Sequence, residues 1–234
     1  MISIILATFN ERELIAKTIT ELLRLSPAEM EIIVVDDDSP DRTWSVAAAL
    51  ELPNVKVIRR LGTRGLASAF NRGIIESRGE FVGWMDADMC MPPSVLPDMY
   101  RMLVDEGYDI VIGSRYAPGG VDDRRPIRTL ASRLINGFAR VVLGYGIRDY
   151  DSGFVLLRRS VFDRVTIIPR GYGEYFIEFI YNACRKGLKV GELGYYFRDR
   201  DEGQSKSFPN VSGFLRTGMH YAVRIVLARL RRID

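Results

Sequence analysis

The chain has 234 residues, of which 47% are hydrophobic and 27% charged, and its formal net charge at pH 7 is +3. These values suit one large globular domain or two small ones, and they exclude the strongly basic profile of a nucleic-acid-binding protein. Two cysteines, Cys90 and Cys184, are too few for a disulfide framework, so a reducing cytoplasmic setting is expected. Neither a signal peptide nor an apolar run of membrane-spanning length is predicted.

The first half of the chain alternates short apolar runs with segments of helical periodicity. The apolar runs predict strands covered on both faces, at 2–7, 32–35, 55–58, 81–85 and 110–112. Helices are predicted between them, at 11–25, 43–50, 66–77 and 94–106. This alternation predicts right-handed βαβ units and therefore an α/β fold, with a mainly parallel central sheet flanked by helices.

The second half of the chain is less regular. The strand around 110–112 extends over 109–114, and further strands are predicted at 154–157 and 189–197. The predicted helices are 128–143, 174–186 and 211–232. The simplest division is one domain at residues 1–209 followed by a C-terminal helix within 210–234. Arg216, His220, Arg224 and Arg231 share one face of that helix. A basic amphipathic helix of this kind either lies in a membrane interface or packs on the domain as an ordinary helix.

Polar residues gather where the predicted strands end. Asp86 and Asp88 follow the fourth strand, and the clusters after the first three strands are Thr8 to Glu11, Asp36 to Asp41, and Arg59 with Arg60. Parallel strands end at one edge of a sheet, where α/β proteins bind their ligands. Asp86 and Asp88 can aim both carboxylates into one volume, as hard oxygen ligands for Mg²⁺ or Mn²⁺ held with substrate phosphates. Two solvated aspartates in a turn are the alternative interpretation.

Several motifs occur in order along residues 2 to 206. They are Thr8-Phe9-Asn10-Glu11-Arg12, Val34 to Asp41, Met85-Asp86-Ala87-Asp88, Gly113-Ser114-Arg115-Tyr116, Arg128-x-Leu130-x-Ser132, Ser152-Gly153-Phe154 and Arg200-x-x-Gly203-x-Ser205-Lys206. Together they resemble the inverting GT-A glycosyltransferases of family 2, and within them the dolichyl-phosphate mannose synthases. The resemblance implies a GT-A fold of the nucleotide-diphospho-sugar transferases. It also implies in-line transfer of mannose from GDP-mannose to a dolichyl or other polyprenyl phosphate, with inversion.

The same resemblance implies a donor site and a metal site. Residues expected at the nucleotide sugar are Ala7, Phe9, Glu11, Val35, Asp37, Asp86, Ala87, Asp88, Arg115, Arg200 and Lys206. The cation, Mg²⁺ or Mn²⁺, is expected on Asp86 and Asp88, where it would support the leaving diphosphate. The resembling enzymes commonly have a glutamine two residues after the second aspartate. Cys90 stands there in this chain, and a thiol is a poor ligand for Mg²⁺.

Arginines are expected to carry the acceptor chemistry. A phosphate monoester has its second pKa near ~6, so such an acceptor is already largely ionised and needs positive charge more than a general base. The resemblance places the acceptor phosphate on Arg115, Arg128, Ser132 and Arg200, and the catalytic set is Asp88, Arg115, Arg128 and Arg200. Ordinary solvated surface residues are the alternative for each arginine alone.

Other interpretations stay open. One alternative is a glucosyltransferase that uses UDP-glucose and the same lipid, because it would need the same phosphate and metal motifs. Another is a nucleotide-binding regulatory homologue without catalysis, which Cys90 at the metal site leaves open. One aspartate of Asp36 to Asp38 is expected to cap its turn rather than bind ligand. A dinucleotide-binding domain is disfavoured because no G-x-G-x-x-G follows the first strand. The protein is expected on the cytoplasmic face of a membrane, peripherally through 128–143 and the C-terminal helix, or through a membrane-anchoring partner protein.

Overall fold

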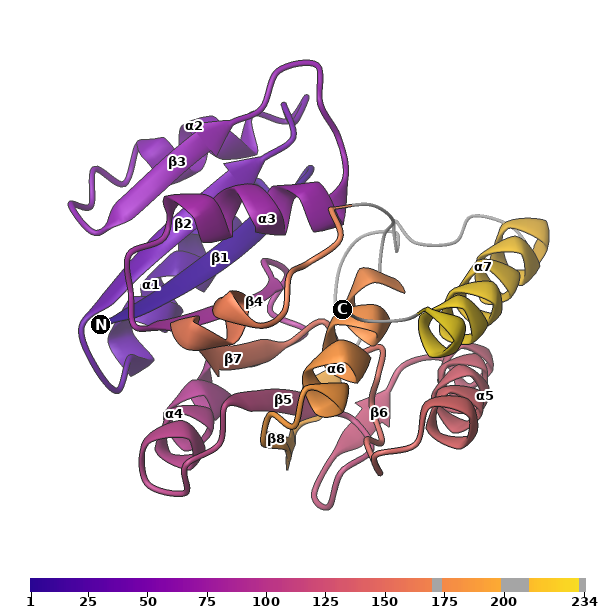
Figure 1. The fold of residues 1–234 in the computed structure, drawn as a ribbon. Helices are drawn as coiled ribbons and strands as arrows, with labels where there is room; N and C mark the ends of the chain where they lie inside the picture. The colour runs from indigo at the N-terminus through magenta and orange to yellow at the C-terminus, as the bar shows by residue number, and fades with distance from the viewer. Residues whose placement is uncertain (170–173, 199–210, 232–234) are drawn as a thin grey trace.

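A seven-stranded sheet forms the centre of the molecule in the computed structural model, which describes residues 1–169, 174–198 and 211–231 (Figure 1). The strand order is β3-β2-β1-β4-β7-β5-β8. The strands are β1 (Ile2–Thr8), β2 (Met30–Asp36), β3 (Val55–Arg59), β4 (Phe81–Asp86), β5 (Ile110–Ser114), β7 (Val155–Arg158) and β8 (Val190–Gly194).

Six of these strands run in one direction. Only β7 is antiparallel to its neighbours β4 and β5, whereas the other pairings are parallel. The prediction of a mainly parallel sheet is therefore confirmed, and the carboxyl ends of six strands share one edge. The register at that edge aligns Ala7 of β1 with Val35 of β2 on one side and Asp86 of β4 on the other. Three residues predicted at the nucleotide sugar are thus strand neighbours.

Helices cover both faces of the sheet because successive strand residues point to opposite sides. On one side, Ile5 and Trp84 pack with Phe70 of α3, in a core to which α6 also contributes. On the other side, Ile4 packs with Ile19 of α1, in a core shared with α4. The helices are α1 (Ile15–Leu25), α2 (Thr43–Ala48), α3 (Leu66–Glu76), α4 (Leu96–Val104), α5 (Pro126–Leu143), α6 (Glu174–Arg185) and α7 (Val211–Leu230).

Helices α5 and α7 lie side by side at one flank of the molecule (Figure 1). Ile225 and Ala228 of α7 join the core that α6 lines. Arg231 donates to the buried carboxylate of Glu178 on α6, and Arg224 lies 3.9 Å from the same group. These two arginines of the predicted basic face therefore turn toward α6. None of the described helices is long and apolar enough to cross a membrane.

The predicted strand 189–197 is divided between two sheets. Its first part is β8, and its last part forms β9 (Tyr196–Arg198), which pairs in parallel with β6 (Val121–Asp123) to make a separate two-stranded sheet. Tyr195 lies at the junction between β8 and β9. The loop between β5 and α5 is thereby tied to the carboxyl edge of the central sheet.

Candidate active site

The loops after β1 and β2 are fastened to each other by hydrogen bonds. Fully buried Asp36 accepts from the Thr8 hydroxyl at 2.8 Å and from the Ser39 amide and hydroxyl at 2.8 and 2.6 Å. The Glu11 amide donates to the Thr43 hydroxyl at 2.9 Å. Asp36 thus shapes the turn, as expected of one aspartate in the Asp36–Asp38 run. Of its neighbours, Asp37 is also buried, whereas the Asp38 side chain is 41% exposed.

Asp37, predicted at the nucleotide, is held by positive charge. Arg60 donates to its Oδ1 from Nε at 2.6 Å, and the Gly65 amide donates to its Oδ2 at 2.8 Å. Both side chains of the Asp37–Arg60 pair are only 10% exposed. Arg60 also donates to the Ser68 hydroxyl at 2.9 Å. This ion pair fixes Asp37 and ties the ends of β2 and β3 to the start of α3.

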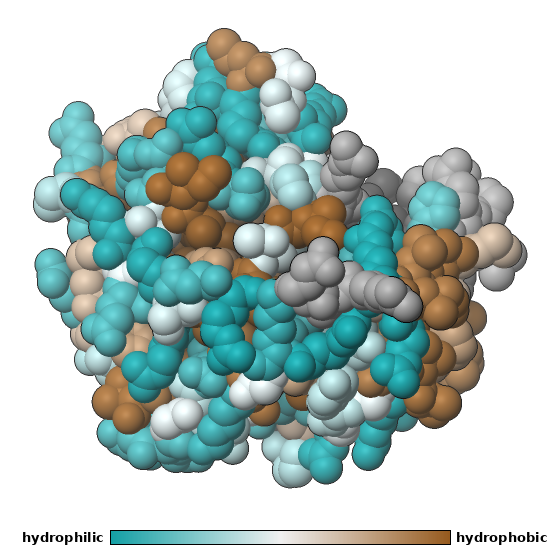
Figure 2. All heavy atoms as spheres, viewed as in Figure 1, coloured by the Kyte–Doolittle hydropathy of each residue, from teal (hydrophilic) through white to brown (hydrophobic). Residues whose placement is uncertain are grey.

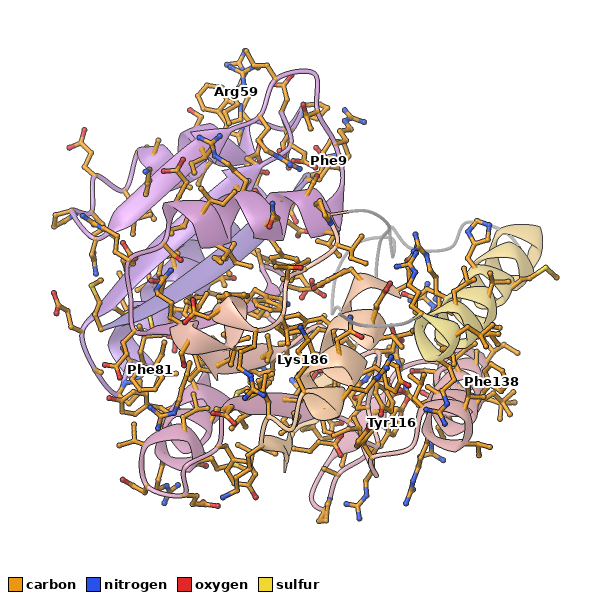
Figure 3. All side chains as sticks on the ribbon, viewed as in Figure 1. Phe9, Arg59, Phe81, Tyr116, Phe138 and Lys186 are labelled. Atoms are coloured by element: carbon orange, nitrogen blue, oxygen red, sulfur yellow. The ribbon has the colours of Figure 1, made fainter. Side chains whose placement is uncertain are left out.

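Aromatic rings flank this edge and carry arginines on their faces. The guanidinium of Arg64 lies 4.3 Å from the ring centroid of Phe9, and that of Arg59 lies 4.3 Å from the ring centroid of Trp44. Figure 3 places Phe9 and Arg59 at the same end of the molecule. Stacked guanidinium and aromatic groups form flat surfaces of the kind that bind a nucleotide base. Contact between Phe9 and the base stays a prediction, and the stacked Arg64–Phe9 pair is consistent with it.

Asp86 and Asp88 lie at and just beyond the end of β4. Both are partly buried, and Asp88 accepts from the Cys90 amide at 3.1 Å. The Ala87 carbonyl accepts from the Thr18 hydroxyl of α1 at 2.9 Å, which anchors the turn. Across the described part of the chain, no three His, Cys, Asp or Glu side chains gather as a metal site. Two carboxylates still fit Mg²⁺ or Mn²⁺, because such ions keep water and phosphate oxygens as further ligands.

Arg115 is held in a buried ion pair that the sequence does not predict. The side chain is 4% exposed, and Asp149 is fully buried. Arg115 donates to Asp149 from Nε at 2.9 Å and from Nη2 at 2.6 Å, and it also donates from Nη2 to the Asp151 carbonyl at 2.8 Å. Burial alone would lower the pKa of Arg115, but Asp149 raises it well above its usual value. The guanidinium is therefore a fixed cation.

Helix α5 places the predicted acceptor residues beside that pair. Arg128 and Ser132 are one turn apart in α5, so they share a face. Asn136, one further turn along, donates to the Ser132 carbonyl at 3.0 Å and to Asp149 at 3.4 Å. Arg115 and Ser132 are thus joined through Asp149 and Asn136, and Arg128 lies one helical turn before Ser132. Of the predicted acceptor set, only Arg200 lies outside the described residues, as Lys206 of the donor set also does.

A strongly basic cavity of about 430 Å³ opens beside α5, and Arg115 and Asn136 of this cluster are part of its lining. Tyr116 stands at its wall, between β6 and α5 (Figure 3), and its lining includes Arg115, Arg133, Arg140 and Arg148. Burial raises the pKa of Tyr116 to about 12, so its hydroxyl stays protonated. Four arginines thus line the cavity at which the sequence predicts the acceptor phosphate.

The chain is similar to proteins of one known family. A model of the Glycosyl transferase family 2 matches residues 3–166, well over half of the chain. The chain belongs to this family. It is 39% identical over 210 residues to the dolichol-phosphate mannosyltransferase of Pyrococcus furiosus, covering 88% of this chain but only 58% of that relative. It is 32% identical over 243 residues to the polyprenol monophosphomannose synthase of Mycolicibacterium smegmatis, covering 98% of this chain and 90% of the relative.

Solved structures share the fold. Glucosyl-3-phosphoglycerate synthase from Mycobacterium tuberculosis, in complex with Mn²⁺, UDP and glucosyl-3-phosphoglycerate, matches all of this chain and 81% of its own. The TM-score is 0.73 and the sequence identity 21%. The same enzyme with Mn²⁺, UDP-glucose and glycerol 3-phosphate gives a TM-score of 0.72 at 19% identity. The predicted GT-A fold of this family 2 chain is confirmed.

Proposed function

We propose that this protein transfers mannose from GDP-mannose to a dolichyl or other polyprenyl phosphate, with inversion at the anomeric carbon. The support is the separation of charge along one sheet edge. Asp86 and Asp88 stand on one side, and the cations Arg115 and Arg128 stand on the other. Both named relatives carry mannosyltransferase or mannose synthase in their names. Relatives of that kind are the best guide to the donor and acceptor.

The residues present supply most of what the reaction needs. A divalent cation on Asp86 and Asp88, Mg²⁺ or Mn²⁺, would neutralise the leaving diphosphate. Asp37 and the Phe9 loop lie where they can bind the nucleotide. Arg115, fixed by Asp149 through Nε and Nη2, can hold the acceptor phosphate in line. No carboxylate base is required, because that phosphate is already ionised.

We also propose that α5 and α7 rest on the surface of an anionic membrane, where the lipid acceptor resides. Figure 2 shows hydrophobic surface over these two helices, and Phe138 of α5 is labelled at that flank in Figure 3. The exposed apolar side chains are Ile127, Leu130, Leu134, Phe138 and Val141 of α5, with Met219, Val223, Val226, Leu227 and Leu230 of α7. Neither helix contains an acidic residue. A cytoplasmic location, a C-terminal unit at 210–234 and a membrane-anchoring partner remain further parts of this proposal.

The deciding experiment measures sugar transfer to dolichyl phosphate in the presence of Mn²⁺, with GDP-mannose and UDP-glucose offered separately. Transfer of mannose from GDP-mannose is expected. Stabilisation by the metal is worth several kcal/mol, so Asp88→Asn should lower kcat by at least about a hundredfold. Asp98→Asn is the matched control, because Asp98 pairs with Arg101 on the surface of α4.

Each alternative has its own outcome in this experiment. Preferred transfer from UDP-glucose would replace the donor assignment and keep the acceptor. Binding of a nucleoside diphosphate without transfer of any sugar would favour a regulatory homologue. An Asp88→Asn variant as active as Asp98→Asn would refute the metal role.

A further inference from the structure

Tyr195 is a buried residue at the junction of the two sheets. Its side chain belongs to a core cluster and the residue is 3% exposed. Its amide donates to the Ser114 carbonyl at 3.1 Å, and its carbonyl accepts from the Val121 amide at 2.9 Å. The ring packs edge-on against Phe154, with centroids 5.5 Å apart. Backbone and ring together fix the direction of the hydroxyl.

The Tyr195 hydroxyl has no hydrogen-bond partner among the described residues. By contrast, the hydroxyl of the similarly buried Tyr150 donates to the Gly144 carbonyl at 2.7 Å. A buried hydroxyl without a partner costs stability, and a native protein keeps such a group where a ligand or water completes it.

The charged groups around this hydroxyl are those of the site. Burial, together with Asp149 and Asp86, raises the pKa of Tyr195 well above its usual value, against the opposing effect of Arg115 and Arg124. The group therefore remains a neutral O–H donor at any working pH. Geometry places the residue at the same site: its amide bonds to the Ser114 carbonyl, next to Arg115, and its side chain shares a core cluster with Ala87, which lies between Asp86 and Asp88.

We propose that Tyr195 is a binding residue of the active site, and that its hydroxyl donates a hydrogen bond to a phosphate oxygen held between Asp86 and Arg115. This proposal rests on the proposed function. A phosphate oxygen is the acceptor that a carboxylate-bound cation and a fixed guanidinium attract from their two sides. The oxygen belongs either to the diphosphate of the donor or to the phosphate of the acceptor, because both must meet in this space.

The test is Tyr195→Phe in the full chain, which removes one oxygen and keeps the ring. Titration calorimetry with GDP and Mn²⁺ measures the affinity for the donor's diphosphate, which is the first arm of the test. Titration with farnesyl phosphate measures the affinity for the acceptor's phosphate, which is the second arm. A hydrogen bond to a charged group predicts at least about tenfold weaker binding in one arm. Thermal unfolding should show a Tm that rises by about 2–4 °C, because the unpaired hydroxyl is gone.

Tyr150→Phe is the matched control, because it removes a buried hydroxyl that has a partner. It should lower the Tm and leave both affinities unchanged. A Tyr195→Phe variant that behaves like this control, or that keeps wild-type affinity in both arms, would overturn the assignment. If the wild-type chain itself binds neither GDP with Mn²⁺ nor farnesyl phosphate, the proposed function fails and this proposal fails with it. A loss of affinity that is seen only in Tyr195→Phe concerns the role of Tyr195 and leaves the proposed function unaffected.

Discussion

The buried pair of Arg115 and Asp149 allows a sharp test of how the site is held. Asp149 accepts three hydrogen bonds from Arg115, from the backbone amide, Nε and Nη2, at 2.9, 2.9 and 2.6 Å. Replacing it by asparagine keeps the shape but removes the main counter-charge of a buried guanidinium, which is left with Asp151, whose Oδ2 lies 3.7 Å from Nη2. Breaking a buried pair in this way costs about 3–5 kcal/mol. For a chain of this length that lowers the Tm by roughly 6–20 °C.

Urea unfolding at pH 7 measures this cost for Asp149→Asn, Arg115→Met and the double variant Arg115→Met/Asp149→Leu. The double variant should recover most of the loss, because an apolar pair of similar volume removes both desolvation penalties. Asp98→Asn, in an exposed pair on α4, should change stability by less than about 1 kcal/mol. A loss in Asp149→Asn as small as in this control would refute the interpretation that Asp149 neutralises and positions Arg115.

Two further predictions concern acid stability and membrane binding. Burial would raise the pKa of Asp122, but hydrogen bonds from Arg124 and Tyr116 lower it to about 2, so its contribution to stability is present above about pH 4 and is lost toward pH 2. Thermal unfolding should therefore show a smaller drop in Tm between pH 6 and pH 3 for Asp122→Asn than for the wild type, and an equal drop would contradict the pairing. Leu134→Asp should weaken sedimentation with anionic liposomes about tenfold or more, whereas Ile75→Asp on α3 should not. Equal binding by both variants would remove α5 from the contact.

The strands of the sheet were predictable because each is marked by a run of apolar residues in its own sequence. Continuously apolar runs such as 2–7 and 81–85 match β1 and β4 closely, since strands buried on both faces need no polar positions. The orientation of β7 was not predictable, because an apolar run does not state its direction. The break at Tyr195 was not predicted either, although Gly194 ends β8 directly before it.

The candidate site was likewise only partly predictable from the sequence. Strand ends indicate which edge carries polar residues, so Asp86 and Asp88 could be placed from the sequence. The partner of each charge could not, because pairing depends on tertiary contacts. Asp37 meets Arg60 across 23 residues, and Arg115 meets Asp149 across 34. The Asp149-Tyr150-Asp151 run was visible in the sequence, but nothing in it indicates that Asp149 is the buried member.

Helix α5 connects the proposed phosphate-binding residues to the surface proposed to face the membrane. Ser132 and Asn136 lie on its buried face, where Asn136 contacts Asp149, while Leu130 and Leu134 lie on its exposed face. One rigid helix thus carries both the acceptor residues and the apolar surface, and the distance between them is set by the helix diameter, about 10–12 Å. A polyprenyl phosphate in a membrane presents its phosphate at the interface and its chain below. Seating α5 at that interface therefore brings the acceptor phosphate toward Arg115 without any rearrangement of the sheet edge.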